Sequence, residues 1–336
     1  MTRPSSMLIL LALLALLTGC PAAPTARKAP VPAPVGQAEL KNVVLRVGDQ
    51  KGGSKSLLAA ADLLRDVPYR IEWSTFTSGP PLLEAASAGA VDIGGVGNTP
   101  PIFAAAANAK VSVVAAAQGD QTGDSLLVPA DSPLHRLADL RGRTIAVAKG
   151  SSSHGVLLAA LRRAGLRPRD VTIAYLTPAE AYAAFSQHRV DAWAIWEPYT
   201  SQALQTTRAR TLVDGRGLTN GLSFQVAGLA ALADPGRNTA IRDYLVRLAR
   251  AMAWSALHPE QRADVWSTET GLQRSVTKAA VDRGVDLATS LDQRVADSEQ
   301  RIADAFFEAG LLPDRVTFAD FVDTRHNNDV LAAVRP

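Results

Sequence analysis

The chain has 336 residues, 47% of them hydrophobic and 5% aromatic, and its formal net charge at pH 7 is +3. This length suits two domains or one large α/β unit. No dense basic cluster with interleaved aromatic residues occurs, so the sequence does not indicate a nucleic-acid surface. The five histidines are scattered without metal-ligand spacing and the chain has one cysteine, so we expect neither a structural zinc site nor a cofactor.

Residues 1–19 have the pattern of a signal peptide, because an early arginine precedes an apolar run from Met7 to Leu17 that is short for a membrane span. The sequence LTGC from Leu17 to Cys20 looks like a lipobox with cleavage before Cys20. A secretory signal followed by an incidental cysteine remains an alternative interpretation. Residues 20–40 are rich in Pro and Ala and lack periodicity, which predicts an extended tether. We therefore expect lipidation at Cys20 and a globular body anchored on the outer face of a cell membrane.

Strand-like and helix-like runs alternate along the body from residue 43 onward. The strand-like runs VVLRVG, YRIEWSTF and VDIGGVG each lead into an alanine- and leucine-rich run of helical character. This rhythm predicts an α/β fold with a parallel sheet and helices on its faces.

The sequence pattern changes near residue 126, where a second α/β unit is expected to begin. Thr177-Pro178-Ala179-Glu180 fits a capping box with proline at the first helical position, so a helix should start there. We predict two lobes with crossings near 126–131 and 222–228. The expected divisions are the first part of lobe 1 over 41–128, lobe 2 over 129–224, and a helix-rich second part of lobe 1 over 225–336.

Small, polar or proline residues follow several putative strands just before a helix, in the turns 48–54, 77–81, 97–101 and 149–154. In an open α/β sheet these turns lie at the carboxyl ends of strands, where ligands bind. Several helix N-termini aimed at one point would make an anion site. Each turn alone is explained equally well as an N-cap or a tight turn. Neither a P-loop nor a GxGxxG dinucleotide fingerprint is present.

The runs KGSSSH and YLTPAEAYAAFSQHRVDAWAIWEPY, with GDQKG, FTSGPPLLEA and VGNTPPIF, resemble the aliphatic-sulfonate substrate-binding proteins of ABC importers over roughly residues 43–330. The resemblance implies a two-lobed periplasmic-binding-protein fold of type II that closes on an oxyanion. It implies no catalysis, a monomer, and an ABC permease with its ATPase as partners. The small anionic ligand that it implies is an alkanesulfonate.

Carried over residue by residue, the resemblance puts eight residues around the ligand: Gln50, Gly79, Pro80, Asn98, Ser151, Ser152, His154 and Trp193. Hydroxyl, amide and imidazole groups can donate to sulfonate oxygens, and Trp193 can offer an apolar face to the alkyl tail. His154 could instead cap its helix, Lys149 could face solvent, and Trp196 is expected to be core or hinge packing. Asn98 and Glu197 stand where several relatives have Asp, which leaves the exact ligand open.

Enzymes are the main competing class. Ser152 and His154 lie two residues apart at a helix start and do not readily face each other, and no GxSxG elbow is present, which disfavours a hydrolase. Desulfinases of this fold use a cysteine nucleophile, whereas the single cysteine here is Cys20 in the signal region. Binders of taurine, nitrate or a thiamine precursor remain open.

Overall fold

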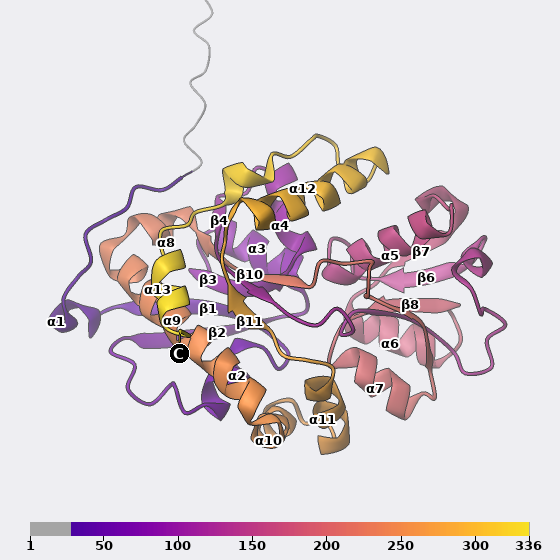
Figure 1. Cartoon of the computed structure of the whole chain (residues 1–336), viewed down its shortest axis with the longest axis horizontal. Helices are drawn as coiled ribbons and strands as arrows, with labels where there is room; N and C mark the ends of the chain where they lie inside the picture. The colour runs from indigo at the N-terminus through magenta and orange to yellow at the C-terminus, as the bar shows by residue number, and fades with distance from the viewer. Residues whose placement is uncertain (1–27, 336) are drawn as a thin grey trace, which may run out of the picture.

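The computed structural model describes residues 28–335 and has two α/β lobes that lie side by side (Figure 1). The larger lobe holds a six-stranded sheet of order β11-β4-β10-β3-β1-β2. Its strands are β1 (Val44–Gln50), β2 (Arg70–Phe76), β3 (Ile93–Gly97), β4 (Val111–Gln118), β10 (Leu222–Gly228) and β11 (Leu287–Thr289). The smaller lobe holds a five-stranded sheet of order β7-β6-β8-β5-β9. Its strands are β5 (Ser125–Val128), β6 (Thr144–Val147), β7 (Thr172–Tyr175), β8 (Ala192–Ile195) and β9 (Arg210–Asp214). The expected two-lobed α/β architecture is confirmed.

Helices cover both faces of each sheet. Those of the larger lobe are α1 (Gln37–Leu40), α2 (Ser54–Ala60), α3 (Gly79–Ser87), α4 (Thr99–Ala106), α8 (Leu229–Ala233), α9 (Pro235–Leu257), α10 (Pro259–Thr270), α11 (Arg274–Asp282), α12 (Gln293–Glu308) and α13 (Asn327–Ala332). Those of the smaller lobe are α5 (Ser152–Arg163), α6 (Pro178–Ser186) and α7 (Tyr199–Thr206). The capping box expected at the start of α6 is present, since the Glu180 carboxylate accepts the Thr177 amide at 2.9 Å.

Each sheet combines parallel and antiparallel pairs of strands. In the larger lobe β1 pairs in parallel with β2 and β3, whereas β10 pairs antiparallel with both β3 and β4. In the smaller lobe β6 pairs in parallel with β7 and β8, whereas β5 pairs antiparallel with β8 and β9. β5 and β10 directly follow a crossing between lobes, so the chain enters each sheet there from the opposite end; the short edge strand β11 also pairs antiparallel, with β4.

The crossings lie earlier in the chain than the expected ranges. Because β5 pairs only within the smaller sheet, the first crossing lies between residues 118 and 125, and the expected division after residue 128 was wrong. Because β10 pairs within the larger sheet, the second lies between residues 214 and 222. The apolar run of β5 shows that a strand is present, but nothing local in it identifies the sheet that the strand joins.

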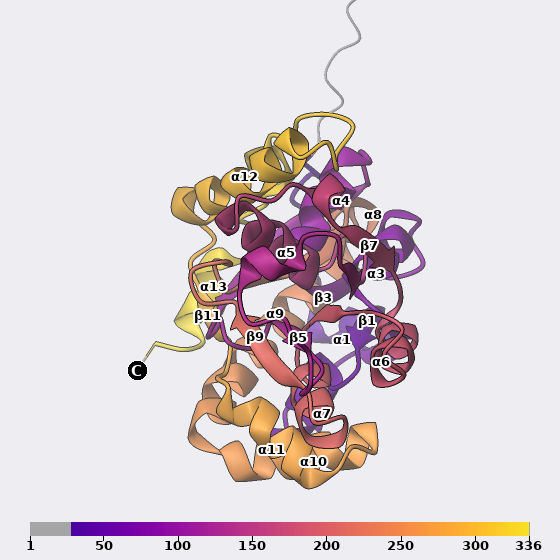
Figure 2. The ribbon, with the colours of Figure 1, turned by 90° about the vertical axis from the view of Figure 1, so that its right-hand side faces the viewer.

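The larger lobe also contacts the smaller lobe through helices on two opposite sides. Helix α12 packs against α5, and α11 packs against α7. Figure 2, which brings the smaller lobe toward the viewer, shows α12 above it and α10 with α11 below it. These two contacts flank the space between the lobes.

The globular body begins earlier than the expected tether boundary at residue 40. Ala29 and Val35 pack against the core of the larger lobe, and Arg325 donates to the carbonyls of Ala29 at 2.6 Å and Pro30 at 3.2 Å. Residues 29–40 therefore belong to the body rather than to a free tether. The expected signal peptide and Cys20 lie outside the described residues. Within residues 28–335 no helix combines the length and apolar character needed to cross a membrane.

Candidate functional site

Two adjoining cavities, of about 230 and 350 Å³, occupy the cleft between the lobes. The smaller one, which we call the serine cavity, is lined by Gly79, Ser151, Ser152 and Trp196 among others. The larger one, the tryptophan cavity, is lined by Leu57, Met252, Trp266 and further apolar residues. They meet at a junction whose residues line both: Gln50, Asp120, Gly123, Glu197, Ser223 and Asp286.

Helix N-termini from both lobes face the serine cavity. Helix α3 of the larger lobe begins at Gly79, and α5 of the smaller lobe begins at Ser152 with Ser151 as its N-cap. The unpaired N–H groups and the dipole of a helix start favour an anion. Two prolines follow Gly79, and since proline has no N–H, α5 offers more backbone donors than α3.

Gly79 has to be glycine because the two helix starts of the larger lobe lie close together. A Cβ atom at Gly79 would lie 2.5 Å from Cγ of Pro100, near the start of α4. Gln50, at the end of β1, donates from its amide to the Gly95 carbonyl at 3.0 Å and so holds its side chain at the junction. These contacts bring the ends of β1 and β3 and the start of α3 to one wall of the cleft.

The hydroxyl groups at the start of α5 hold the carboxylate of Asp124. Ser152 donates to Asp124 Oδ1 at 2.9 Å, and Ser153 donates to the same oxygen at 2.5 Å. Removal from water raises the pKa of Asp124 to about 6, the two serine hydrogen bonds act to lower it, and the nearby Asp286 raises it. The start of α5 therefore already stabilises one anionic group, which shows that its donors suit an oxyanion.

Four of the eight residues expected around a ligand line this cleft: Gln50, Gly79, Ser151 and Ser152. Pro80 instead lines a separate groove between α3 and α4, together with Lys149 and Phe103. The Lys149 ammonium lies over the Tyr175 ring, 5.8 Å from its centroid, and does not reach the cleft.

Asn98 lies at the second crossing rather than in either cleft cavity. Its buried amide donates to Thr219 Oγ1 at 2.9 Å and to Asn220 Oδ1 at 2.8 Å. Asn220 in turn donates to the Glu299 carboxylate at 2.6 Å. Asn98 thus connects the start of α4 with the crossing segment and with α12.

His154 is buried between the lobes beside the aromatic rings of Phe103, Tyr175 and Phe306. Its Nδ1 accepts the Gly150 amide at 3.1 Å, and its Nε2 has no hydrogen-bond partner among the described residues. Burial, and to a smaller extent the charge of Lys149, lower the pKa of His154 to about 4. The ring is therefore neutral at pH 7. It does not meet the Ser152 hydroxyl, so the structure holds no serine–histidine pair here.

Trp196, rather than the neighbouring Trp193, lines the cleft. Trp193 is fully buried in the core of the smaller lobe, where it packs against Tyr182 and Phe185. Trp196, expected as core or hinge packing, does pack against this core and in addition lines the serine cavity. The reason is that β8 is buried on both faces, so Trp193 faces the core whichever face it lies on. Trp196 comes just after the end of the strand, where its side chain can reach the cleft.

The tryptophan cavity combines apolar walls with one stacked guanidinium. The Arg262 guanidinium lies 4.6 Å from the Trp266 ring centroid and donates to Ser56 Oγ at 2.7 Å and to the Gly52 carbonyl at 2.9 Å. Trp266 is 9% exposed, and its indole N–H has no partner among the described residues. This cavity therefore suits an apolar or weakly polar group rather than an anion.

Sequence reasoning missed the carboxylates of the cleft: Asp120, Asp124 and Asp286, with Glu197 noted only as a departure from relatives. Glu197 pairs with Arg283 at 2.9 Å and accepts the Ser201 hydroxyl at 2.9 Å, while burial raises its pKa to about 7. The available signal was the run GDQTGD at 119–124, a polar turn between two buried strands. Within the described residues no group of acidic, histidine or cysteine side chains could hold a metal ion.

Comparisons with known proteins agree with this geometry. The family model of the ABC transporter phosphonate periplasmic substrate-binding proteins matches residues 59–255. A protein of Escherichia coli K12, named for the binding of aliphatic sulfonates, is 39% identical over 284 residues, which is 83% of this chain and 88% of that protein. The taurine-binding periplasmic protein of the same organism is 30% identical over 164 residues, 48% of this chain and 50% of that one.

Among solved structures, the alkanesulfonate-binding protein SsuA from Xanthomonas axonopodis pv. citri bound to MOPS matches with a TM-score of 0.79 and 35% identity. The match covers 84% of this chain and 99% of that one. These relatives are binding proteins, and the similarity extends over both lobes.

Proposed function

The chain belongs to the periplasmic substrate-binding proteins of ABC transporters, and from this premise we propose that it binds aliphatic sulfonates in the cleft between its lobes. Members of this family are receptors rather than enzymes, act outside the cytoplasmic membrane, and work with an ABC transporter. The observation that carries the proposal is the serine cavity, where the starts of α3 and α5 from opposite lobes face one space that adjoins an apolar cavity.

The sulfonate is held at the start of α5. Its oxygens accept hydrogen bonds from the Ser151 and Ser152 hydroxyls, from backbone N–H groups of the helix start, and from the Gln50 amide. In the structure the Ser152 hydroxyl donates to Asp124 at 2.9 Å and the Ser151 hydroxyl donates to the Ala148 carbonyl at 2.8 Å, so a sulfonate has to take over both donors. The organic part of the ligand extends past Trp196 toward the tryptophan cavity.

Closure of the lobes completes the site. The ligand contacts both lobes, so it favours the closed state only by the extra contacts that it makes there. Closure removes water from the cleft and strengthens each hydrogen bond to the anion. The closed form is then delivered to the permease and its ATPase. We also propose that the receptor is a monomer.

Calorimetry with alkanesulfonates of graded chain length tests the proposal. We expect Ser152→Ala to weaken butanesulfonate binding by about tenfold, which is the loss of one hydrogen bond to a charged group. Ser186→Ala on α6 is the matched control, because that serine is exposed and donates only to the Tyr182 carbonyl. If no alkanesulfonate binds the unmodified protein, the proposal is wrong. Equal binding by both variants would show that the anion lies elsewhere.

The membrane anchor is a separate proposal. We infer lipidation of Cys20 after removal of residues 1–19, on the strength of the LTGC sequence. Growth with a labelled fatty acid should label the wild-type protein and leave Cys20→Ser unlabelled. Label retained by the variant would contradict this inference.

A further inference from the structure

A third cavity lies where helix α12 of the larger lobe packs against helix α5 of the smaller lobe (Figure 1). Its volume is about 300 Å³, and we call it the arginine cavity. Its walls come from residues 155–162 of α5, 217–220 of the second crossing and 298–306 of α12, with Asn98. Among the described residues it shares Thr219 with the serine cavity and none with the tryptophan cavity. It is therefore a separate space beside the joint between the lobes.

Two arginines from opposite lobes line this cavity without a partner. Arg162 lies in the last turn of α5 and Arg301 lies on α12, and both are exposed. Within residues 28–335, neither guanidinium group makes an ion pair or a hydrogen bond. The neighbouring Arg163, in contrast, donates to the Gly217 carbonyl at 2.7 Å and so holds the crossing segment against α5. Arg162 and Arg301 thus bring two positive charges to one space, with all their N–H donors free.

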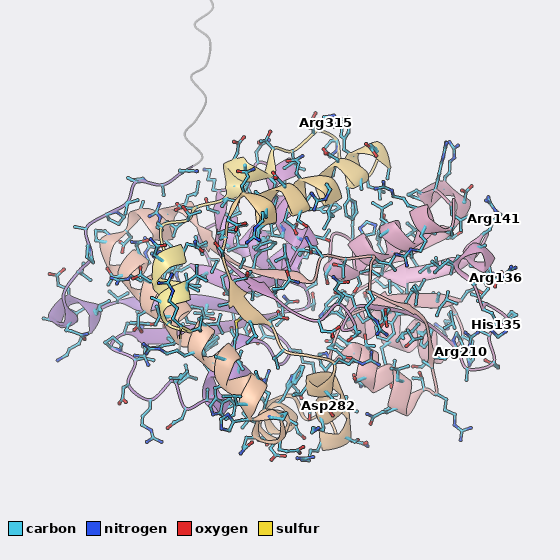
Figure 3. The ribbon with its side chains drawn as sticks, in the orientation of Figure 1. His135, Arg136, Arg141, Arg210, Asp282 and Arg315 are labelled. Carbon is cyan, nitrogen blue, oxygen red and sulfur yellow. The ribbon has the colours of Figure 1, made fainter. Side chains whose placement is uncertain are left out.

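No carboxylate offsets these charges inside the cavity, because none of the described residues that line it is Asp or Glu. Asp297 and Asp304 lie within about one turn of Arg301 on α12, but both have other partners. Asp297 accepts the Gln293 amide at 2.8 Å. Asp304 pairs at 3.4 Å with Arg315, which Figure 3 shows at the outer edge of the molecule. The charge of Arg301 is therefore left for a ligand.

The acid that is hydrogen-bonded to the cavity wall is neutral. Glu299 accepts the amide of Asn220, a lining residue, at 2.6 Å. Removal from water raises the pKa of Glu299 to about 8, so its carboxyl group is protonated at pH 7. It therefore places no negative charge behind the cavity that would repel an anion.

Two hydroxyl groups of the cavity have a hydrogen left to donate. Ser298 Oγ accepts the Asn220 amide at 3.0 Å, and Thr219 Oγ1 accepts the Asn98 amide at 2.9 Å. A hydroxyl group both accepts and donates, and no described residue accepts a hydrogen bond from either of these two. The amides hold the two oxygens in place, while their hydrogens remain available to an oxygen of a ligand.

The remainder of the wall is apolar. Leu158 of α5 and Ile302 and Phe306 of α12 line the same cavity. A volume of about 300 Å³ lies at the lower end of the range for sites that bind small molecules. The cavity therefore has room for a small organic group beside the charged one.

We propose that the arginine cavity is a second ligand site, which binds a small organic dianion of the phosphate monoester class. A phosphate monoester carries close to two negative charges at pH 7 and has three oxygens that accept hydrogen bonds. The planar guanidinium groups of Arg162 and Arg301 match such oxygens. The Ser298 and Thr219 hydroxyls donate to the phosphate as well, and the organic group packs against Leu158 and its apolar neighbours. This site goes beyond the proposed function, because it lies outside the cleft.

Calorimetry on the full chain with phenyl phosphate tests the proposal, with butanesulfonate present at saturation to fill the cleft. We expect one further binding site with a Kd below about 1 mM. Arg162→Gln and Arg301→Gln should each weaken this binding about tenfold, which is the loss of hydrogen bonds to a charged group. Phenol has the same ring without the phosphate and should bind at least about tenfold more weakly than phenyl phosphate.

Arg136→Gln is the matched control, because it removes the same charge from an exposed side chain at the remote end of the smaller lobe (Figure 3). It should leave the Kd for phenyl phosphate within about twofold. Equal Kd values for the three arginine variants, or an absence of binding to the unmodified protein, would overturn the proposal. So would complete displacement of phenyl phosphate by butanesulfonate, since the two would then share the cleft. If butanesulfonate itself does not bind, the proposed function fails, and the same comparison of variants without it still decides the second site.

Discussion

The buried carboxyl group of Glu299 on α12 gives the most direct test of the electrostatics of the lobe crossing. Its side chain is 0% exposed, one oxygen accepts the Asn220 amide at 2.6 Å, and the other has no partner among the described residues. Desolvation raises the pKa of Glu299 to about 8, and the Asn220 hydrogen bond lowers it only partly. We therefore expect Glu299 to be protonated at pH 7 in the folded protein.

The expected effect of Glu299→Gln follows from proton linkage. A carboxyl whose folded pKa is raised binds a proton more tightly in the folded state, so stability falls as pH rises from about 4.5 towards about 8. At about 1.4 kcal/mol for each pH unit, the fall between about pH 5 and pH 7.5 is of the order of 3 kcal/mol. Glutamine resembles the protonated carboxyl and does not ionise, so the variant should lose this fall.

Urea unfolding at about pH 5, 6.5 and 8 measures the effect. The free energy of unfolding of Glu299→Gln minus that of the wild type should increase with pH, and taking this difference cancels the titration of other groups such as His326. Glu308→Gln, at an exposed position on the same helix, is the control and should give a pH-independent difference. A Glu299→Gln difference that is constant with pH would refute the reasoning.

Two further predictions concern the cleft and the N-terminal segment. Trp196→Ala should weaken sulfonate binding by about tenfold, whereas Trp193→Phe should lower the melting temperature and leave the Kd within about twofold, as calorimetry and thermal unfolding would show. Binding lost in the Trp193 variant alone would restore the sequence-based assignment. Arg325→Ala should destabilise the protein by about 3 kcal/mol and speed hydrogen exchange at residues 29–35, because Asp323 is left buried and unpaired. Arg315→Ala, at an exposed ion pair, should cost less than about 1 kcal/mol, and equal losses in the two variants would argue against this role of Arg325.

The fold was predictable to the level of its elements because the signals are local. Apolar runs of strand length, followed by alanine-rich runs of helical length, gave the α/β class, and Thr177 with Glu180 gave the start of α6. The change of sequence pattern near residue 126 gave the two lobes, and the resemblance to a known family implied the same architecture. The crossing before β5 was placed too late, because the three apolar residues of this strand could pair in either sheet.

The site was predictable in part, for the same reason. Ser151 and Ser152 were singled out because they lie in a small polar turn before a helix and because the resemblance put them at the ligand; both line the serine cavity. Trp193 was expected at the ligand but lies in the core, because the face to which a strand residue points can be read from alternation only when one face of the sheet meets water. β8 is buried on both faces, so the sequence offered no alternation.

The sequence by itself determined the small polar turns at the ends of strands and the helix starts that follow them, since both depend on neighbouring residues. Only the tertiary structure decided which of these turns meet. Asp124, Glu197 and Asp286 are distant in the chain and none belongs to a periodic pattern, yet sheet order and the two crossings bring them to one junction. The charge of the cleft depends on which side chains the fold brings together there. The spacing of residues along the sequence does not show which segments the packing of the two lobes will bring into contact.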